Sequence, residues 1–119
     1  KIIFQKDLKI KDNQFEDIIF ITFKEILNSA KNIAIKNNSK LYFIYLPEFN
    51  RYKNNYINNN YHLIRKIVND LEIPFIDIDK EVFKKEKNPL KFFPDSKAGH
   101  YNEKGYYSIG KKIHNLVQN

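Results

Sequence analysis

The segment Gly99–Tyr106 contains His100, the residue whose type and setting best suit catalysis. An imidazole exchanges protons at neutral pH because its ordinary pKa is about 6.5. Gly99 allows the chain to turn before this histidine, and Asn102 is suited to cap a helix that follows it. Such a turn can hold an imidazole at the mouth of a cleft, as a general base requires. His100 is therefore the best catalytic candidate, and the alternative is a loop histidine without a role.

The other two histidines, His62 and His114, lie within predicted helices, where we expect structural or surface roles. The three histidines are widely spaced and form no His-x-x-x-His pair, so the sequence predicts no metal site. The chain has no cysteine, which excludes disulfides, thiol nucleophiles and zinc–thiolate sites. With only three glycines it also has no glycine-rich phosphate loop, and no cofactor is expected.

A catalytic histidine needs a nucleophile and an orienting acid. The hydroxyl side chains lie in predicted helices, turns or a loop, and none has the strained turn of a nucleophilic serine. These residues are Thr22, Ser29, Ser39, Ser96 and Ser108. Three acids are candidates for the orienting role. Asp95 is closest to His100 in the sequence. Asp77 and Asp79 lie at the end of a predicted strand, and at least one of them is expected to cap the next helix.

The formal net charge of +7 raises the question of a polyanionic partner. The positive residues are mostly scattered lysines, arginine occurs only at Arg51 and Arg65, and asparagine and isoleucine are abundant. This composition is typical of an AT-rich genome, so we do not expect nucleic acid as a partner. No apolar run approaches the roughly 18 residues that a membrane span needs, so no span is expected. The absence of methionine suggests a piece of a longer chain.

The pattern of apolar residues predicts helices near 14–37, 57–72 and 102–117, because apolar side chains recur there at three- and four-residue spacing. Continuous apolar runs predict strands near 41–46 and 73–78. Strands that alternate with helices form parallel sheets, and functional groups collect at the carboxyl ends of such strands. We expect the loop of His100 to return to that edge. Two strands alone are marginal, so residues 1–119 are interpreted as one incomplete domain.

Four motifs resemble the C-terminal half of an SGNH (GDSL-type) hydrolase, over about residues 14–118. They are Leu41–Tyr52 (LYFIYLPEFNRY), Ile73–Ile78 (IPFIDI), Asn88–Pro94 (NPLKFFP) and Gly99–Tyr106 (GHYNEKGY). The last contains the His-x-Asn-x-x-Gly pattern of the family. The resemblance implies a flavodoxin-like three-layer α/β/α fold and cleavage of ester or acyl groups, often on lipids or carbohydrates.

By the same resemblance, His100 is the general base that takes the serine proton, and Asn102 is the structural residue after it. In the family an acid usually stands three residues before the histidine. That position is Lys97 here, and Asp95 is the nearest substitute. The serine nucleophile and the oxyanion-hole glycine and asparagine come from the earlier half of the family domain. The Gly-Asp-Ser motif is not among these 119 residues.

These observations predict the C-terminal portion of an SGNH-like serine hydrolase that supplies His100, with Asp95 as its acid. The partners expected are an acylated small-molecule, carbohydrate or lipid substrate and the missing N-terminal half of the same protein. The chain by itself is expected to be inactive. The alternatives are a non-catalytic basic binding module that engages a polyanion and a degenerate relative whose fold serves only as a scaffold.

Overall fold

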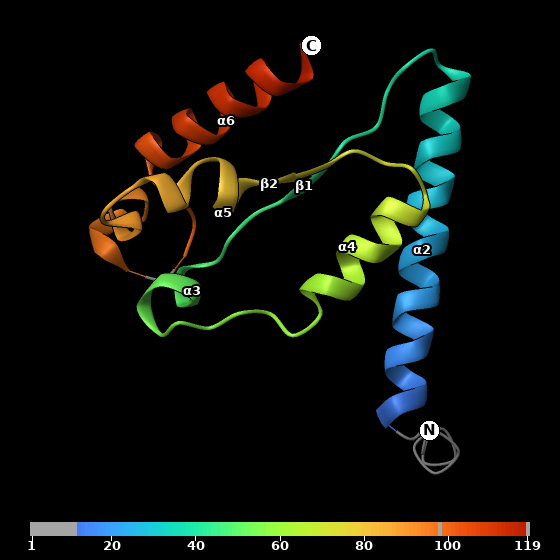
Figure 1. Ribbon diagram of the computed structural model, residues 1–119, viewed down its shortest axis with the longest axis horizontal. Helices are drawn as coiled ribbons and strands as arrows, with labels where there is room; N and C mark the ends of the chain where they lie inside the picture. The colour runs from blue at the N-terminus through green and yellow to red at the C-terminus, as the bar shows by residue number, and fades with distance from the viewer. Residues whose placement is uncertain (1–11, 98, 119) are drawn as a thin grey trace, which may run out of the picture. The chain divides into compact units, whose positions relative to one another are not determined.

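The computed structural model describes residues 12–97 and 99–118 (Figure 1). By its internal contacts the chain divides into two compact units, Lys1–Leu41 and Tyr42–Asn119. Each unit is described by itself. All the residues proposed for catalysis lie in the second unit.

The described part of the first unit is dominated by one helix, α2, which spans Asp12–Lys36 and confirms the helix predicted near 14–37. The helix ends in a Schellman motif, in which Asn38 adopts a left-handed backbone with φ of 52°. The amide of Asn38 donates to the carbonyl of Ile35 at 3.1 Å, and that of Ser39 donates to the carbonyl of Ala34 at 2.8 Å. Much of the apolar surface of α2 is exposed. The large exposed side chains are Phe15, Ile18, Ile19, Ile21, Ile26, Ile33 and Ile35.

The second unit contains a parallel sheet of two strands, β1 (Phe43–Tyr45) and β2 (Phe75–Asp77). Phe43 pairs with Phe75, and Tyr45 pairs with Asp77 at the carboxyl end. The predicted parallel pairing is confirmed, and the chain is α/β in the broad sense. Both strands are shorter than predicted, because Pro47 soon follows β1 and Asp77 already caps a helix that follows β2. The three-layer arrangement stays a prediction.

The sheet is accompanied by short helices and turns, and α6 is the last element of the unit. In chain order they are α3 (Phe49–Lys53), α4 (Tyr61–Asp70), α5 (Ile78–Glu81), the 3₁₀ turns η1 (Phe83–Lys85), η2 (Pro89–Phe92) and η3 (Pro94–Ser96), and α6 (Glu103–Val117). The helix predicted near 57–72 is shorter at both ends. The Asn58 side chain accepts from the amide of Asn60 at 2.8 Å in a turn before α4. After the helix, Glu72 adopts a left-handed backbone with φ of 56°.

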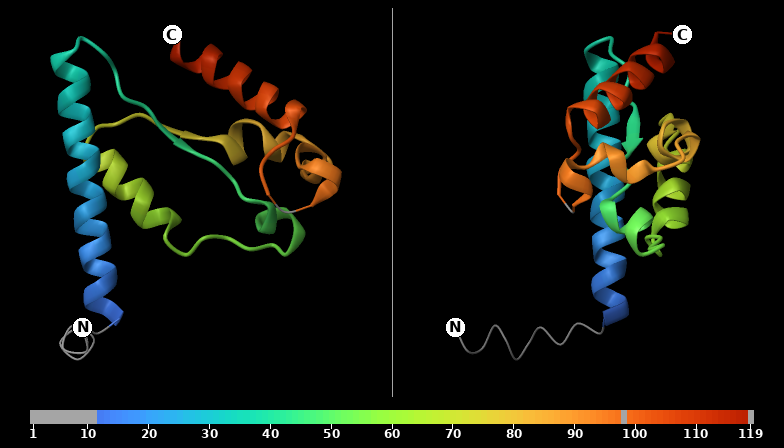
Figure 2. Two further views of the ribbon diagram at one scale, coloured as in Figure 1. Left: turned by 180° about the vertical axis from the view of Figure 1, so that it is seen from behind. Right: turned by 90° about the vertical axis from the view of Figure 1, so that its left-hand side faces the viewer.

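The core of the second unit lies between the sheet, the 3₁₀ turns and α6. Its buried cluster comprises Ile76, Ile78, Phe83, Phe92, Phe93 and Ile109. Phe83 is fully buried and stacks on Tyr52 with ring centroids 5.3 Å apart. In Figure 2, the turns between α5 and α6 lie at the N-terminal end of α6 in both views. Phe92 and Phe93, which belong to the turns before His100, therefore supply core side chains next to the helix that follows this histidine.

Candidate functional site

His100 lies in the short connection between η3 and α6, and its side chain is exposed. Gly99, directly before it, has φ of 134°. Side chains disfavour that backbone conformation, although a Cβ at Gly99 would meet nothing within 4 Å. Glycine is therefore required here by the turn and not by crowding, as the sequence predicts.

Asn102 fixes the start of α6 behind this histidine. Its Oδ1 accepts from the amide of Gly105 at 2.9 Å, which confirms the predicted N-cap. Its Nδ2 donates to the carbonyl of Lys91 at 2.7 Å, and its own amide donates to the carbonyl of Phe92 at 2.8 Å. One side chain thus caps α6 and holds the cap against η2.

Gly105 allows a close approach between α6 and η2. A Cβ at this position would lie 2.8 Å from the carbonyl oxygen of Phe92 and 3.0 Å from the Cβ of Tyr101. Real Cβ atoms do not tolerate the first distance. The asparagine and the glycine of the His-x-Asn-x-x-Gly pattern therefore have structural roles, which fix the backbone beside His100.

Tyr101 brings the histidine loop to the carboxyl end of β1. Its hydroxyl donates to the carbonyl of Pro47, 54 residues earlier in the chain. Its ring packs against Phe83 and Phe93 with centroids 5.4 and 5.2 Å away. Burial raises the pKa of the Tyr101 phenol, so the hydroxyl stays a donor. The prediction that the loop of His100 returns to the strand ends is confirmed.

A hollow of about 270 Å³ lies beside His100. Its walls combine residues from the end of β1 with residues from the histidine loop and α6. The lining residues are Leu46, Pro47, Glu48, Phe93, Gly99, His100, Tyr101 and Tyr106. The wall is largely apolar and aromatic, and it carries one imidazole and one carboxyl group. This arrangement suits the acceptance of a proton next to an apolar group.

Asp95, the predicted acid, is not among the residues that line this hollow. It lies in η3 with φ of 49°, and its side chain is exposed. Within residues 12–97 and 99–118, the Asp95 carboxylate has no hydrogen bond or ion pair. Its pairing with His100 stays a prediction.

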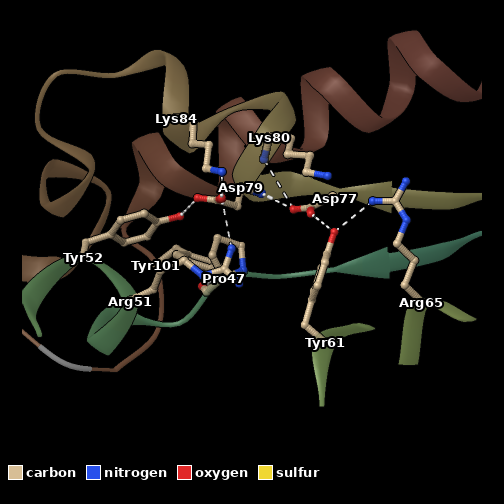
Figure 3. A network of polar contacts seen from close by, with 10 residues as sticks. All are labelled: Pro47, Arg51, Tyr52, Tyr61, Arg65, Asp77, Asp79, Lys80, Lys84 and Tyr101. Carbon is tan, nitrogen blue, oxygen red and sulfur yellow. Dashed lines mark hydrogen bonds and ion pairs between the residues drawn. The ribbon is translucent and has the colours of Figure 1, made fainter. Parts of the chain in front are cut away.

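Asp77, the second acid considered, caps α5. Its Oδ1 accepts from the amides of Asp79 and Lys80 at 3.0 and 3.4 Å, which confirms the predicted cap. Its Oδ2 accepts from the Tyr61 hydroxyl at 2.5 Å, and Arg65 donates to that hydroxyl at 3.0 Å (Figure 3). Burial and the hydrogen bond to Asp77 raise the pKa of Tyr61. These partners occupy Asp77, which does not line the hollow of His100.

Asp79, the third acid, is almost wholly buried and has three side-chain partners (Figure 3). Tyr52 donates to Oδ1 at 2.6 Å, and Arg51 and Lys84 pair with Oδ2 at 3.0 and 3.4 Å. Burial is the largest cause of the raised pKa of Tyr52, and the hydrogen bond to Asp79 adds to it. This cluster ties α3 to the segment after β2.

A cavity of about 510 Å³ lies beside the two acids and is larger than the hollow of His100. Its lining includes Tyr61, Asp77, Asp79 and the exposed His62. The sequence indicates the two acids as candidates but not the network of contacts around them. The signal that indicates it is the pair of arginines in a lysine-rich chain, since guanidinium suits buried carboxylates better than ammonium does. All buried polar side-chain atoms of the described residues have hydrogen-bond partners.

The remaining candidate residues lie where the sequence predicts. His114 is exposed on α6, Ser108 lies in the same helix, and Ser39 follows α2. None of these three lines the hollow of His100. The side chain of Ser96 lies outside the described part of the structure. Among the side chains that are described, the hollow brings His100 together with a carboxyl group but with no serine or threonine.

Comparisons of the chain with protein-family models, with curated proteins and with solved structures found no match. The resemblance to SGNH hydrolases therefore rests on the motifs and stays a prediction. Among the residues that the structure describes, no helix combines the length and the apolar character needed to cross a bilayer.

Proposed function

We propose that this chain is the C-terminal portion of an SGNH-like serine hydrolase that acts on ester or acyl groups. The observation that carries the proposal is the position of His100 in a hollow at the carboxyl end of β1. Parallel α/β sheets collect their functional groups at that edge. The two residues of the histidine motif that have structural roles, Asn102 and Gly105, hold the start of α6 against η2.

In this proposal His100 acts as the general base. One imidazole nitrogen accepts the proton of a serine hydroxyl as the serine oxygen bonds to the acyl carbon. The same nitrogen then returns the proton to the leaving oxygen as the ester bond breaks. The serine and the oxyanion-hole donors lie outside this chain, so the 119 residues supply half of the machinery. The apolar walls from Leu46 and Tyr106 suit an acyl substituent beside the reacting group.

The test uses the protein expressed from the complete coding sequence that contains this chain. Its esterase activity is assayed with p-nitrophenyl acetate. Replacement of His100 by Ala is expected to lower kcat/KM by about 10³-fold or more, because loss of the base removes activation of the nucleophile. His114→Ala is the matched control, since His114 is exposed on α6 outside the hollow, and turnover should stay within about twofold of the parent.

Two results would contradict the proposal. Turnover that survives His100→Ala would remove this histidine from the mechanism. Turnover by the 119-residue chain alone, still dependent on His100, would place the nucleophile within the chain. The upstream coding sequence gives an independent check, because the proposal requires a serine motif after an apolar strand.

A further inference from the structure

The hollow of His100 contains the carboxyl group of a residue far from the histidine in the sequence. Glu48, the first residue after Pro47 at the end of β1, lines the hollow together with His100. Asp95, Asp77 and Asp79 do not line it. Lys97 holds the position three residues before the histidine, so that position offers no carboxylate. Glu48 is therefore the acidic residue that shares the hollow with the imidazole.

The Glu48 side chain has no other function in the described structure. It stands at the N-cap of α3 with an extended backbone, but it makes no capping hydrogen bond. Its side chain is exposed, and within the described residues it has no hydrogen bond or ion pair. Its charge reaches the wall of the hollow, because it adds to the effect of burial in raising the pKa of Tyr101. The carboxylate is thus available to a partner in the hollow.

The backbone on both sides of Glu48 is held firmly. Pro47 is fully buried, and its carbonyl accepts from the Tyr101 hydroxyl. On the other side, Arg51 and Tyr52 of α3 both bind the buried Asp79. These contacts fix where the backbone of Glu48 lies, so its carboxylate starts from the end of β1 beside the hollow. The buried network thus supports the position of Glu48 although it does not contact His100.

We propose that Glu48 is the positioning residue of His100, accepting a hydrogen bond from its Nδ1–H when the two exposed side chains turn toward each other in the hollow that both line. This inference rests on the proposed function for its catalytic meaning, but the pairing itself can be tested without catalysis. A carboxylate on Nδ1 leaves Nε2 unprotonated and ready to accept a proton, and it stabilises the imidazolium that forms. The other titratable groups of the hollow, Tyr101 and Tyr106, are phenols and carry no charge at neutral pH.

The experiment measures the imidazole tautomer of His100 in the 119-residue chain by nitrogen NMR at a pH at which the ring is neutral. The Nδ1–H form is expected to dominate, whereas an imidazole in water without such a partner favours the Nε2–H form. Glu48→Ala should shift His100 toward the Nε2–H form. Glu48→Lys, which reverses the charge, should do the same. Asp95→Ala is the matched control and should leave the tautomer unchanged. The signals of His62 and His114 report whether each variant is folded.

An unchanged tautomer in both Glu48 variants overturns the pairing, and a shift in Asp95→Ala overturns it by assigning the role to Asp95. In the complete esterase, Glu48→Ala should lower kcat by about 10²-fold or more with little change in KM, because a positioning residue acts in the transition state. The two proposals fail separately. An intact tautomer effect without any esterase activity contradicts the proposed function alone, whereas activity that needs His100 but not Glu48 contradicts the inference alone.

Discussion

At the scale of single residues, the chain uses its two arginines at the buried carboxylates. Arg51 binds Asp79 directly, and Arg65 binds the tyrosine that donates to Asp77. A buried carboxylate is stable only when its oxygens are paired, and a guanidinium supplies several donors in a fixed plane. The exposed positions of the same chain are filled with lysine. The use of arginine in place of lysine therefore indicates a position next to a buried carboxylate, which the net charge of the chain does not reveal.

Removal of the Asp79 charge should destabilise the second unit strongly. Asp79→Asn removes the anionic partner of Arg51, whose side chain is only 14% exposed. Loss of one member of a buried pair costs about 3 kcal/mol or more, which urea unfolding can measure. The matched control is Asp70→Asn, which breaks an ion pair with Lys66 whose side chains are 49% and 70% exposed. That change should cost less than about 1 kcal/mol. Equal costs for the two variants would contradict a structural role of the Asp79 network.

The sequence identifies local features of the site well and distant pairings poorly. Gly99 and Asn102 are recognisable because a left-handed turn and a helix cap each depend on a few neighbouring residues. Glu48 is not recognisable as a neighbour of His100, because the hollow depends on the path of the chain between them. Closeness in sequence favours Asp95, but Asp95 in η3 is not among the residues that line the hollow. Tertiary proximity is the information that a single sequence lacks.

At the scale of elements, the contact between α6 and η2 determines where the histidine loop lies. Gly105 permits this contact, and the Asn102 side chain bridges both elements. The sequence predicts the start and end of α6 accurately because its apolar spacing and its cap agree. The sequence predicts α4 and both strands to be longer than they are. A turn at Asn58 delays the start of α4, and the cap at Asp77 ends β2 before the apolar pattern ends.

Two glycine substitutions in α6 should change stability in opposite directions. Gly105→Ala places a Cβ 2.8 Å from the carbonyl oxygen of the buried Phe92, and such overpacking costs about 1–3 kcal/mol. Gly110→Ala has nothing within 4 Å of the new Cβ, so it should stabilise the helix by about 0.5–1 kcal/mol. Thermal unfolding followed by circular dichroism measures both. If both variants shift the melting temperature in the same direction, the close approach at Gly105 is wrong.

At the scale of the whole molecule, tyrosine phenols that are at least partly buried link stability to alkaline pH. Burial is the main cause that raises the pKa of four tyrosines in the second unit. They are Tyr45, Tyr52, Tyr61 and Tyr101. Above about pH 10 the unfolded chain releases their protons while the folded chain retains them, so unfolding becomes more favourable. The contribution is complete below that pH and is lost as the pH rises toward the folded-state pKa values.

The free energy of unfolding should therefore decline above about pH 10. Urea unfolding at a series of alkaline pH values measures this decline, and tyrosinate absorbance identifies the groups that ionise. Tyr52→Phe should make the decline shallower, because it removes one phenol whose pKa is raised by burial. A decline of the same steepness in Tyr52→Phe would show that this phenol does not contribute to the linkage.

The hydrogen bond from Tyr101 to Pro47 has a consequence for folding. The bond joins two residues that are 54 positions apart, and closing the chain between them costs conformational entropy. The surrounding contacts must form to offset this cost. A short peptide containing the histidine motif cannot reproduce the hollow, because half of its wall belongs to the end of β1. His100 and Glu48 thus come together only when the histidine loop lies against the end of β1. The tautomer of this imidazole would therefore report the tertiary structure, which the histidine motif cannot form by itself.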